Sequence, residues 1–296
     1  MIKVIYDGNL GNNLFQYTLG RLIAERLNFY LESVPINGFP GTYEKVGLHR
    51  IISDNKIILR GQNPSLDFLD DPNTVNKTII LQGYFQNTTF YEQHREKIKD
   101  ILRLSYEEVK EEMPINPNDV VIGMRRRRDY IPRHGLPTSY YENALDLIRY
   151  RNVYICTDAP NDPFVKTFAK RHNATIRHPH PLDNLKFITK FANIIISNST
   201  FLWWGAFLSD ANKIVFPRPQ NGFWSEMDEV SRGIKLEVSD PSYIYLKADL
   251  YKSEFFTESL LNQVDRININ ARGIIRKYFP SFVLRPLPKR SEFLDS

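Results

Sequence analysis

Short apolar runs alternate with segments in which apolar residues recur at helical spacing along most of the chain. In the first part of the sequence, this pattern predicts strands over 2–6, 29–31, 56–60 and 78–81, and helices from residue 12 and over 90–102. In the second part, it predicts strands over 120–124, 153–157, 194–197 and 213–216, and helices over 139–150, 163–172, 182–191 and 200–208. Strands that alternate with helices predict α/β units with parallel sheets covered on both faces.

A turn-rich segment separates the two series, because residues 113–119 contain Pro114 and Pro117 together with residues that favour turns. In the last part of the chain, Ile274 and Ile275 stand beside basic side chains, which predicts a mostly helical segment with a basic face. We therefore predict an N-terminal α/β domain over 1–115, a second α/β domain over 116–240 and a basic helical tail over 241–296.

Composition adds that the chain is an ordinary folded protein, with 42% hydrophobic and 25% charged residues. Its 39 lysine and arginine residues against 34 aspartate and glutamate residues give a net charge of +5. Much of this excess lies in residues 266–290, which contain seven basic and no acidic side chains. We therefore predict no nucleic-acid partner. Two interpretations of the tail stay open: contact with an anionic membrane surface, or packing across the domains with a solvated basic face.

The sequence predicts a cytoplasmic location. If the basic tail contacts a membrane, the protein would be peripheral to that membrane. Residues 2–6 form a predicted strand and lack the apolar core of a secretory signal. The most apolar later segment, 191–208, is interrupted by polar residues and is too polar to span a bilayer. The lone Cys156 lies in a predicted strand, where we expect a small buried side chain without a disulfide partner.

The turn after the first predicted strand is the first candidate for chemistry. Gly8 and Gly11 allow the backbone to approach a ligand, and the helix that follows offers free N–H groups at its N-terminus. The spacing differs from the G-x-G-x-x-G dinucleotide fingerprint, because no third glycine follows. The alternative interpretation is a tight turn in which Asn12 caps the helix.

Four consecutive arginines, residues 125–128, follow the predicted strand 120–124. Ligands bind at this end of the strands in an open α/β sheet, and arginine side chains bind phosphate oxygens in a bidentate way. We expect two of the four to bind a ligand and Asp129 to hold one guanidinium group in place. The alternative is a solvated basic loop or a nucleic-acid patch.

Residues 197–200, Ser-Asn-Ser-Thr, lead from a predicted strand into a predicted helix. Hydroxyl groups and unpaired N–H groups at such a junction form an anion site, and helix capping alone explains only one of the three hydroxyl residues. Asp158 ends another predicted strand at the same edge, where its carboxylate can accept hydrogen bonds from a guanine base or a ribose hydroxyl. The alternative for Asp158 is a helix cap ahead of Pro160.

Other enzyme classes are disfavoured by the motifs that the sequence lacks. It contains no G-x-S-x-G, Walker A or zinc-type Cys/His cluster. His178 and His180 have no third ligand at a credible spacing, so we predict a loop there and no metal site.

Three segments together resemble the α-1,2-fucosyltransferase family, which is glycosyltransferase family 11. Residues 8–17 (GNLGNNLFQY) are similar to its G-G-x-G-N-Q-x-F-Q-Y signature, and residues 197–204 (SNSTFLWW) match S-N-S-[ST]-F-x-W-W. Residues 124–129 (MRRRRD) align with H-x-R-R-x-D. Residues 81–86 (LQGYFQ) are also similar to the family segment L-x-G-Y-[FW]-Q.

The resemblance implies a fold and an activity. The fold is GT-B-like, with two Rossmann-like domains facing a cleft, the acceptor on the N-terminal domain and the nucleotide sugar on the second. The activity is that of an inverting, metal-independent galactoside α-1,2-fucosyltransferase. Such an enzyme moves fucose from GDP-fucose to a hydroxyl of a glycan, here O-2 of a terminal galactose, and needs no further cofactor.

The resemblance also implies roles for individual residues. Arg126 and Arg127 would grip the diphosphate, and Asp158 would face the guanosine. Asn12 would lie beside the fucose and the acceptor, and forms the predicted catalytic set with Arg126 and Asp129. The remaining predicted donor-binding residues are Gly11, Asn198, Ser199, Thr200 and Phe201.

The sequence leaves the arginine pair and the base open. Met124 stands where the motif has histidine, so the paired arginines are residues 125 and 126 or residues 126 and 127. The proton of the acceptor hydroxyl could go to Asp7, to Asp129 or to the leaving phosphate. Three other functions also stay open: transfer from another GDP-sugar, non-catalytic binding of a nucleotide sugar or glycan, and nucleic-acid binding through residues 125–128.

Overall fold

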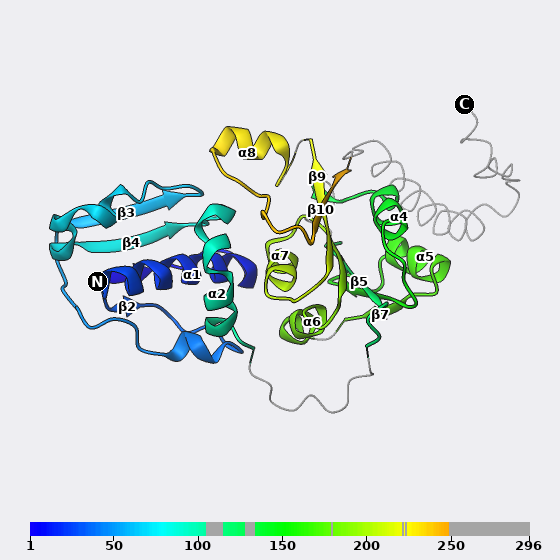
Figure 1. Cartoon of the computed structure of the whole chain (residues 1–296), viewed down its shortest axis with the longest axis horizontal. Coiled ribbons are helices and arrows are strands. Elements are labelled where there is room, and N and C mark those ends of the chain that lie inside the picture. Colours follow the sequence, from blue (N-terminus) through cyan, green and yellow to red (C-terminus); the bar gives the residue numbers. More distant parts are fainter. Residues whose placement is uncertain (105–114, 128–133, 179, 221, 223, 249–296) are drawn as a thin grey trace, which may run out of the picture. The chain divides into compact units, whose positions relative to one another are not determined.

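Two separate parallel sheets form the framework of the molecule, as the alternation of strands and helices predicts (Figure 1). The computed structural model describes residues 1–104, 115–127, 134–178, 180–220, 222 and 224–248. These residues belong to one compact unit, Met1–Tyr251. Arg128, Asp129 and residues 249–296 lie outside the described residues.

The first sheet has four parallel strands in the order β2-β1-β4-β3. They are β1 (Ile2–Val4), β2 (Leu31–Glu32), β3 (Lys56–Gly61) and β4 (Thr78–Gly83). Helix α1 (Leu10–Leu27) connects β1 to β2, and α2 (Arg95–Ile101) follows the sheet. Short 3₁₀ helices lie in the connections: Pro40–Tyr43, Asp67–Asp70, Pro72–Asn76, Thr88–Phe90 and Glu92–His94.

The second sheet has six parallel strands in the order β10-β9-β8-β5-β6-β7. They are β5 (Val120–Met124), β6 (Val153–Thr157), β7 (Thr175–Arg177), β8 (Asn193–Ile196), β9 (Lys213–Pro219) and β10 (Tyr243–Ala248). The helices between them are α4 (Thr138–Asp146), α5 (Pro163–Arg171), α6 (Pro181–Ile188), α7 (Thr200–Phe207) and α8 (Glu226–Arg232).

The strand order makes the second sheet doubly wound. The chain runs outward through β5, β6 and β7, returns to the middle, and runs outward on the other side through β8, β9 and β10. The direction changes between β5 and β8, which are direct neighbours. In such sheets, ligands bind outside the carboxyl ends of the strands at this point. The residues that follow Met124 and Ile196 therefore lie where a ligand is expected.

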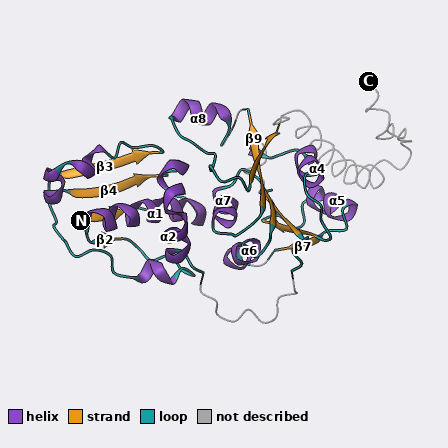
Figure 2. Ribbon diagram, in the orientation of Figure 1, coloured by secondary structure: helices purple, strands orange, loops and turns teal. Residues whose placement is uncertain are grey.

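The central strands form because their sequences suit a sheet that is covered on both faces. Strands β5, β6 and β8 are buried along their whole length, and their apolar runs are typical of parallel strands. Figure 2 shows α4 and α5 on one face of this sheet and α6 and α7 on the other. Each face has its own core, with Tyr141 and Phe168 on the first side and Phe187 and Trp204 on the second.

The core beneath α6 and α7 continues into the first sheet. It contains Ile2 and Leu81 of the first sheet as well as Ile194 of the second. Phe15 of α1 lies at the junction, where its ring centroid is 4.8 Å from the ring centroids of both Trp203 and Trp204 of α7. Buried aromatic packing therefore joins the two predicted α/β domains.

Several elements differ from the sequence predictions. The strand predicted at 29–31 lies at Leu31–Glu32, and the helix predicted at 90–102 begins at Arg95 after two 3₁₀ helices. The sequence pattern does not predict β7 or α8, because β7 is at most half-buried and α8 buries only Asp228. Exposed elements of this kind lack the apolar periodicity on which the predictions depend.

Strand β10 corrects the prediction of a helical tail that begins at residue 241. Residues 243–248 pair in parallel with β9 along their whole length and extend the second sheet. Tyr243, Ile244 and Tyr245 are aromatic and β-branched residues, which favour a strand over a helix. Among the helices that the structure describes, none is both long enough and apolar enough to cross a membrane.

Phe15→Ala is expected to lower the free energy of unfolding by about 3–5 kcal/mol, because it removes a buried ring from the junction of the two sheets. Chemical denaturation followed by tryptophan fluorescence measures this loss. Leu48→Ala is the control, because Leu48 is 85% exposed and its truncation should change the stability by less than about 0.5 kcal/mol. A Phe15→Ala protein as stable as the wild type would contradict the shared core.

Candidate functional site

The loops that follow β5 and β8 are fastened to each other at the carboxyl edge of the second sheet. The hydroxyl oxygen of Ser197 accepts a hydrogen bond from the backbone N–H of Arg125, at 3.1 Å. The backbone N–H of Ser197 donates to the carbonyl oxygen of Gly123, at 3.0 Å. The structure therefore brings together the arginine run and the Ser-Asn-Ser-Thr segment, as expected for the ends of neighbouring parallel strands.

The N-terminus of α7 presents backbone N–H groups at this edge. Ser199 is the N-cap residue, with extended backbone angles, and its side chain makes no capping hydrogen bond. Its carbonyl oxygen accepts the first helical hydrogen bond, from Trp203 at 2.8 Å. The N–H groups of Thr200 and Phe201 belong to the first turn, where a helix offers no acceptor of its own. Together with the helix dipole, these groups favour a bound anion.

Two carboxylates set the arrangement of the arginine run. The Oδ1 atom of Asp158 accepts a hydrogen bond from the backbone N–H of Arg126 at 2.7 Å, and Oδ2 lies 2.9 Å from Nη1 of Arg125. The Arg126 side chain is buried, with Nη2 3.4 Å from Oδ1 of Asp162 and the guanidinium carbon 3.9 Å from the ring centre of Phe164. Arg125 is half-buried beside this group.

The three described arginines therefore differ in environment. Arg127 is exposed, whereas Arg126 is buried against α5. The alternative in which Asp158 caps the next helix is wrong, because Asp162 caps α5 by accepting a hydrogen bond from the N–H of Phe164 at 2.8 Å. Asp158 instead holds the start of the arginine run at the edge where its contact with a nucleoside is predicted.

The first sheet contributes Gly11, which lies directly against the N-terminus of α7. A Cβ on Gly11 would lie 2.5 Å from the backbone nitrogen of Phe201 and 2.6 Å from Oγ1 of Thr200, so only glycine fits there. The carbonyl oxygen of Gly11 also accepts a hydrogen bond from Nε1 of Trp204, at 3.0 Å. We call this contact between the first turns of α1 and α7 the helix junction.

Asn12 lies beside the helix junction but does not cap α1. The helix begins at Leu10, and its N-cap is Asn9, which contradicts the capping alternative for Asn12. The side-chain oxygen of Asn12 accepts a hydrogen bond from Nε2 of Gln86, at 3.0 Å. Gln86 follows β4, so this bond ties the first turn of α1 to the carboxyl edge of the first sheet.

Asp7 supplies a carboxylate at the same edge of the first sheet. It is exposed, and its Oδ2 atom accepts a hydrogen bond from the hydroxyl of Tyr84, at 2.7 Å. This hydrogen bond raises the pKa of Tyr84, because ionising the phenol would lose the donated proton. The backbone N–H of Asp7 donates to the side chain of Gln16, at 3.1 Å, which fixes the backbone of the turn.

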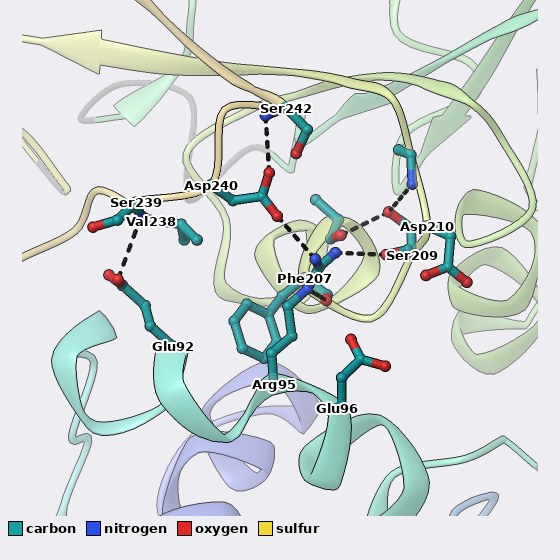
Figure 3. Close-up of polar contacts among 12 residues, drawn as sticks. Glu92, Arg95, Glu96, Phe207, Ser209, Asp210, Val238, Ser239, Asp240 and Ser242 are labelled. Atoms are coloured by element: carbon teal, nitrogen blue, oxygen red, sulfur yellow. Dashed lines mark hydrogen bonds and ion pairs between the residues drawn. The ribbon is translucent and has the colours of Figure 1, made fainter.

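Arg95 holds α7 at its opposite end (Figure 3). Its guanidinium group donates to the carbonyl oxygens of Phe207 at 3.0 Å and Ser209 at 2.7 Å, and pairs with Asp240 at 2.9 Å. A cation at a helix C-terminus satisfies carbonyl groups and complements the helix dipole. The pKa of Asp240 is lowered, chiefly by the hydrogen bond from the backbone N–H of Ser242, with Arg95 adding to the effect.

Four further residues shape this region. His178 was predicted only as a loop residue, but its Nδ1 atom lies 2.7 Å from the carbonyl oxygen of Thr157 at the edge of the second sheet. Met124, at the position of the motif's histidine, is buried in the core between the sheet and α4. Arg95 and Trp224 carry no sequence signal, because their contacts join distant parts of the chain.

The described residues include no group of three or more histidine, cysteine, aspartate or glutamate side chains arranged to hold a metal ion. Asp129, which the sequence places among the catalytic candidates, lies outside these residues.

The family model described as "Glycosyl transferase family 11" matches residues 44–232, which is more than half of the chain. A curated relative, the O-antigen biosynthesis glycosyltransferase WbnK of Escherichia coli, is 27% identical over 172 residues. The match covers 50% of this chain and 57% of WbnK, so the chain matches somewhat more than half the length of that relative.

Arg95→Ala is expected to lower the free energy of unfolding by about 2–4 kcal/mol, because it leaves the carbonyl oxygens of Phe207 and Ser209 without this donor and Asp240 without its cation. Urea denaturation measures the loss. Arg103→Ala is the matched control, since Arg103 is 71% exposed and its pair with Asp100 should contribute less than about 1 kcal/mol. Equal stability of the two variants would contradict the capping role of Arg95.

Proposed function

Because the chain belongs to glycosyl transferase family 11, we propose that it is an inverting fucosyltransferase that uses GDP-fucose as its donor. The family match confirms the resemblance seen in the sequence motifs. The observation that carries the proposal is the anion-binding edge of the second sheet, where the first turn of α7 and the arginine run meet between β5 and β8. The acceptor in this proposal is a glycan, with O-2 of a terminal galactose as the hydroxyl that receives fucose.

In this proposal the diphosphate lies at the first turn of α7. The N–H groups of Thr200 and Phe201 donate to phosphate oxygens, with the Ser199 hydroxyl and Asn198 beside them. Arg127, which is exposed, and Arg125 turn toward the diphosphate from the neighbouring loop. Guanidinium groups suit this role because they bind phosphate oxygens in a bidentate way.

In this proposal Arg126 has both a structural and an electrostatic role. Its burial over Phe164 and its pair with Asp162 anchor the loop, and its charge adds to the positive potential at the diphosphate. Asp158 fixes the backbone of the loop and keeps its predicted place beside the guanosine. The nucleoside would then extend over the carboxyl ends of β5 and β6, which are adjacent.

The chemistry follows from where charge develops. Departure of GDP leaves an oxocarbenium-like sugar and places negative charge on the β-phosphate. N–H groups and guanidinium groups aimed at that phosphate stabilise the transition state more than the ground state. The guanidinium groups thereby take the part that a divalent cation plays in metal-dependent transferases.

The acceptor side of the proposal lies at the first sheet. Asn12 would lie beside the fucose, next to the helix junction. The acceptor hydroxyl loses a proton as its oxygen attacks the anomeric carbon from the face opposite GDP, which inverts the configuration. Among the candidate bases, Asp7 lies within the part of the chain that the structure describes. Asp129 and the leaving phosphate are the other candidates. The name of WbnK assigns that relative to O-antigen biosynthesis, which supports a glycan of the O-antigen type as the acceptor class here.

Purified protein is expected to release GDP and form a fucosylated product from GDP-fucose and a β-galactoside in the presence of EDTA. Product linkage analysis identifies the hydroxyl that receives fucose. GDP-mannose is the comparison donor. If the protein transfers mannose faster than fucose, the proposed donor becomes GDP-mannose. No turnover with any acceptor, together with no binding of GDP by calorimetry, would contradict the proposed function.

Arg127→Ala is expected to lower kcat by about 10²–10³, by analogy with the loss of a donor to a developing oxyanion, with little change in stability. Arg126→Ala is expected to lower both kcat and the melting temperature, because its side chain is buried. Steady-state kinetics and thermal unfolding separate the two effects, with Arg103→Ala as the exposed control. Full activity in both variants would remove the arginine run from the donor site.

A further inference from the structure

Gln86 is a buried side chain whose carboxamide lies between the two halves of the proposed site. It is 3% exposed. Its Oε1 atom accepts a hydrogen bond from Nε1 of Trp224 at 3.0 Å, and its Nε2 atom donates to Oδ1 of Asn12 at 3.0 Å. Its backbone N–H donates to Oε1 of Gln62, at 2.8 Å. Gln86 thus connects a residue of the loop after β9 to the first turn of α1.

The direction of this chain of hydrogen bonds is fixed by the indole. A tryptophan N–H can donate but cannot accept, so the oxygen of Gln86 must face Trp224. The amide nitrogen of Gln86 then faces Asn12, and Asn12 must turn its oxygen toward Gln86. The amide nitrogen of Asn12 therefore points away from Gln86, with both of its protons available as donors.

The indole is itself held firmly on the second sheet. Trp224 is 1% exposed, and its ring stacks on Phe216 with a centroid distance of 5.9 Å. Its backbone N–H donates to Oδ2 of Asp228, at 3.1 Å. The orientation of the Asn12 amide is therefore dictated by a residue whose position belongs to the core of the other sheet.

The amide nitrogen of Asn12 lies at the open side of the helix junction. It is next to Gly8, where a Cβ would approach it to 2.3 Å, and Gly8 is exposed and has a φ of +83°. Asn12 also follows Gly11, which touches Thr200 and Phe201. The two N–H donors thus lie beside the exposed turn at Gly8, on the residue that follows the contact with the first turn of α7.

We propose that Gln86 and Trp224 are positioning residues, which orient Asn12 so that its amide N–H groups donate to an oxygen of the bound nucleotide sugar. This inference rests on the proposed function. The Asn12 amide would recognise an oxygen atom that accepts a hydrogen bond. This oxygen belongs either to the diphosphate or to a hydroxyl of the sugar. The opposite orientation would aim the carbonyl oxygen of Asn12 at the same atom, where it would repel a phosphate oxygen and could only accept from a sugar hydroxyl.

Gln86→Glu tests the orientation directly. A carboxylate keeps the shape of the side chain and still accepts from Trp224, but it cannot donate to Asn12. Asn12 must then reverse its amide and present oxygen to the ligand. The expected result is a loss of about 10- to 100-fold in kcat/KM, the range of one hydrogen bond to a charged or polar group.

The second arm of the experiment places Gln86→Glu in an Asn12→Ala background. If Gln86 acts through Asn12, the substitution causes no further loss there, whereas a general disturbance of the fold would persist. Gln62→Glu is the matched control, because it adds a carboxylate beside Gln86 and retains the acceptor for the backbone N–H of Gln86. It is expected to keep activity within about twofold of the wild type.

Binding measurements identify which oxygen is recognised. If Gln86→Glu weakens GDP and GDP-fucose alike in calorimetry, the amide contacts the diphosphate. If it weakens only GDP-fucose, the amide contacts the sugar. Trp224→Phe, which keeps an aromatic side chain and removes the indole N–H, repeats the test if Gln86→Glu does not fold, and it should show a smaller loss in the same direction.

Two results would overturn the inference. One is wild-type kcat/KM and nucleotide affinity in Gln86→Glu, and the other is a full loss that persists in the Asn12→Ala background. Failure of the proposed function is a different result, namely a wild-type protein that neither turns over nor binds any GDP-sugar.

Discussion

The packing of α1 against α7 is the interaction on which the rest of the structure depends. Each helix follows an inner strand of its own sheet, so each brings a helix N-terminus to a carboxyl edge. Phe15 packs against the indole rings of both Trp203 and Trp204, and the backbone of Gly11 meets the first turn of α7. A side chain larger than hydrogen at Gly11 would separate the two N-termini. The contact therefore places the donors of both halves around one point.

The shared core explains how the proposed site is kept in place before any ligand arrives. Helix α7 is held by Gly11 at one end and by Arg95 at the other, and both groups belong to the part of the chain that builds the first sheet. Groups that act on a developing charge are most effective when their dipoles are already oriented. The aromatic packing, the cap at the C-terminus of α7 and the chain of hydrogen bonds through Gln86 all supply such orientation, and each of them crosses from one sheet to the other.

Local sequence pattern was enough for the elements that are buried on both faces. Strands β5 and β6 have the bounds that the sequence predicts, because a short continuous apolar run is typical of a parallel strand that is buried on both faces. Exposed β7 and α8 give no such signal, and β10 follows a long connection in residues that the prediction assigned to the basic tail. The meeting of the arginine run with residues 197–200 could be predicted, since neighbouring parallel strands end at one edge. The contacts of Arg95 with Phe207 and of Gln86 with Trp224 could not be predicted. Each joins residues more than a hundred positions apart, and no local pattern records such a pair.

The sequence also could not predict which arginines of the run are buried and which are exposed, because this depends on which carboxylates lie nearby. Asp158 and Asp162 decide which guanidinium group is buried and which stays exposed. The most direct test of the whole account is a crystal structure of the protein with GDP. The β-phosphate is expected within hydrogen-bonding distance of the backbone nitrogens of Thr200 and Phe201, beside Gly11. A nucleotide bound away from the helix junction would contradict it.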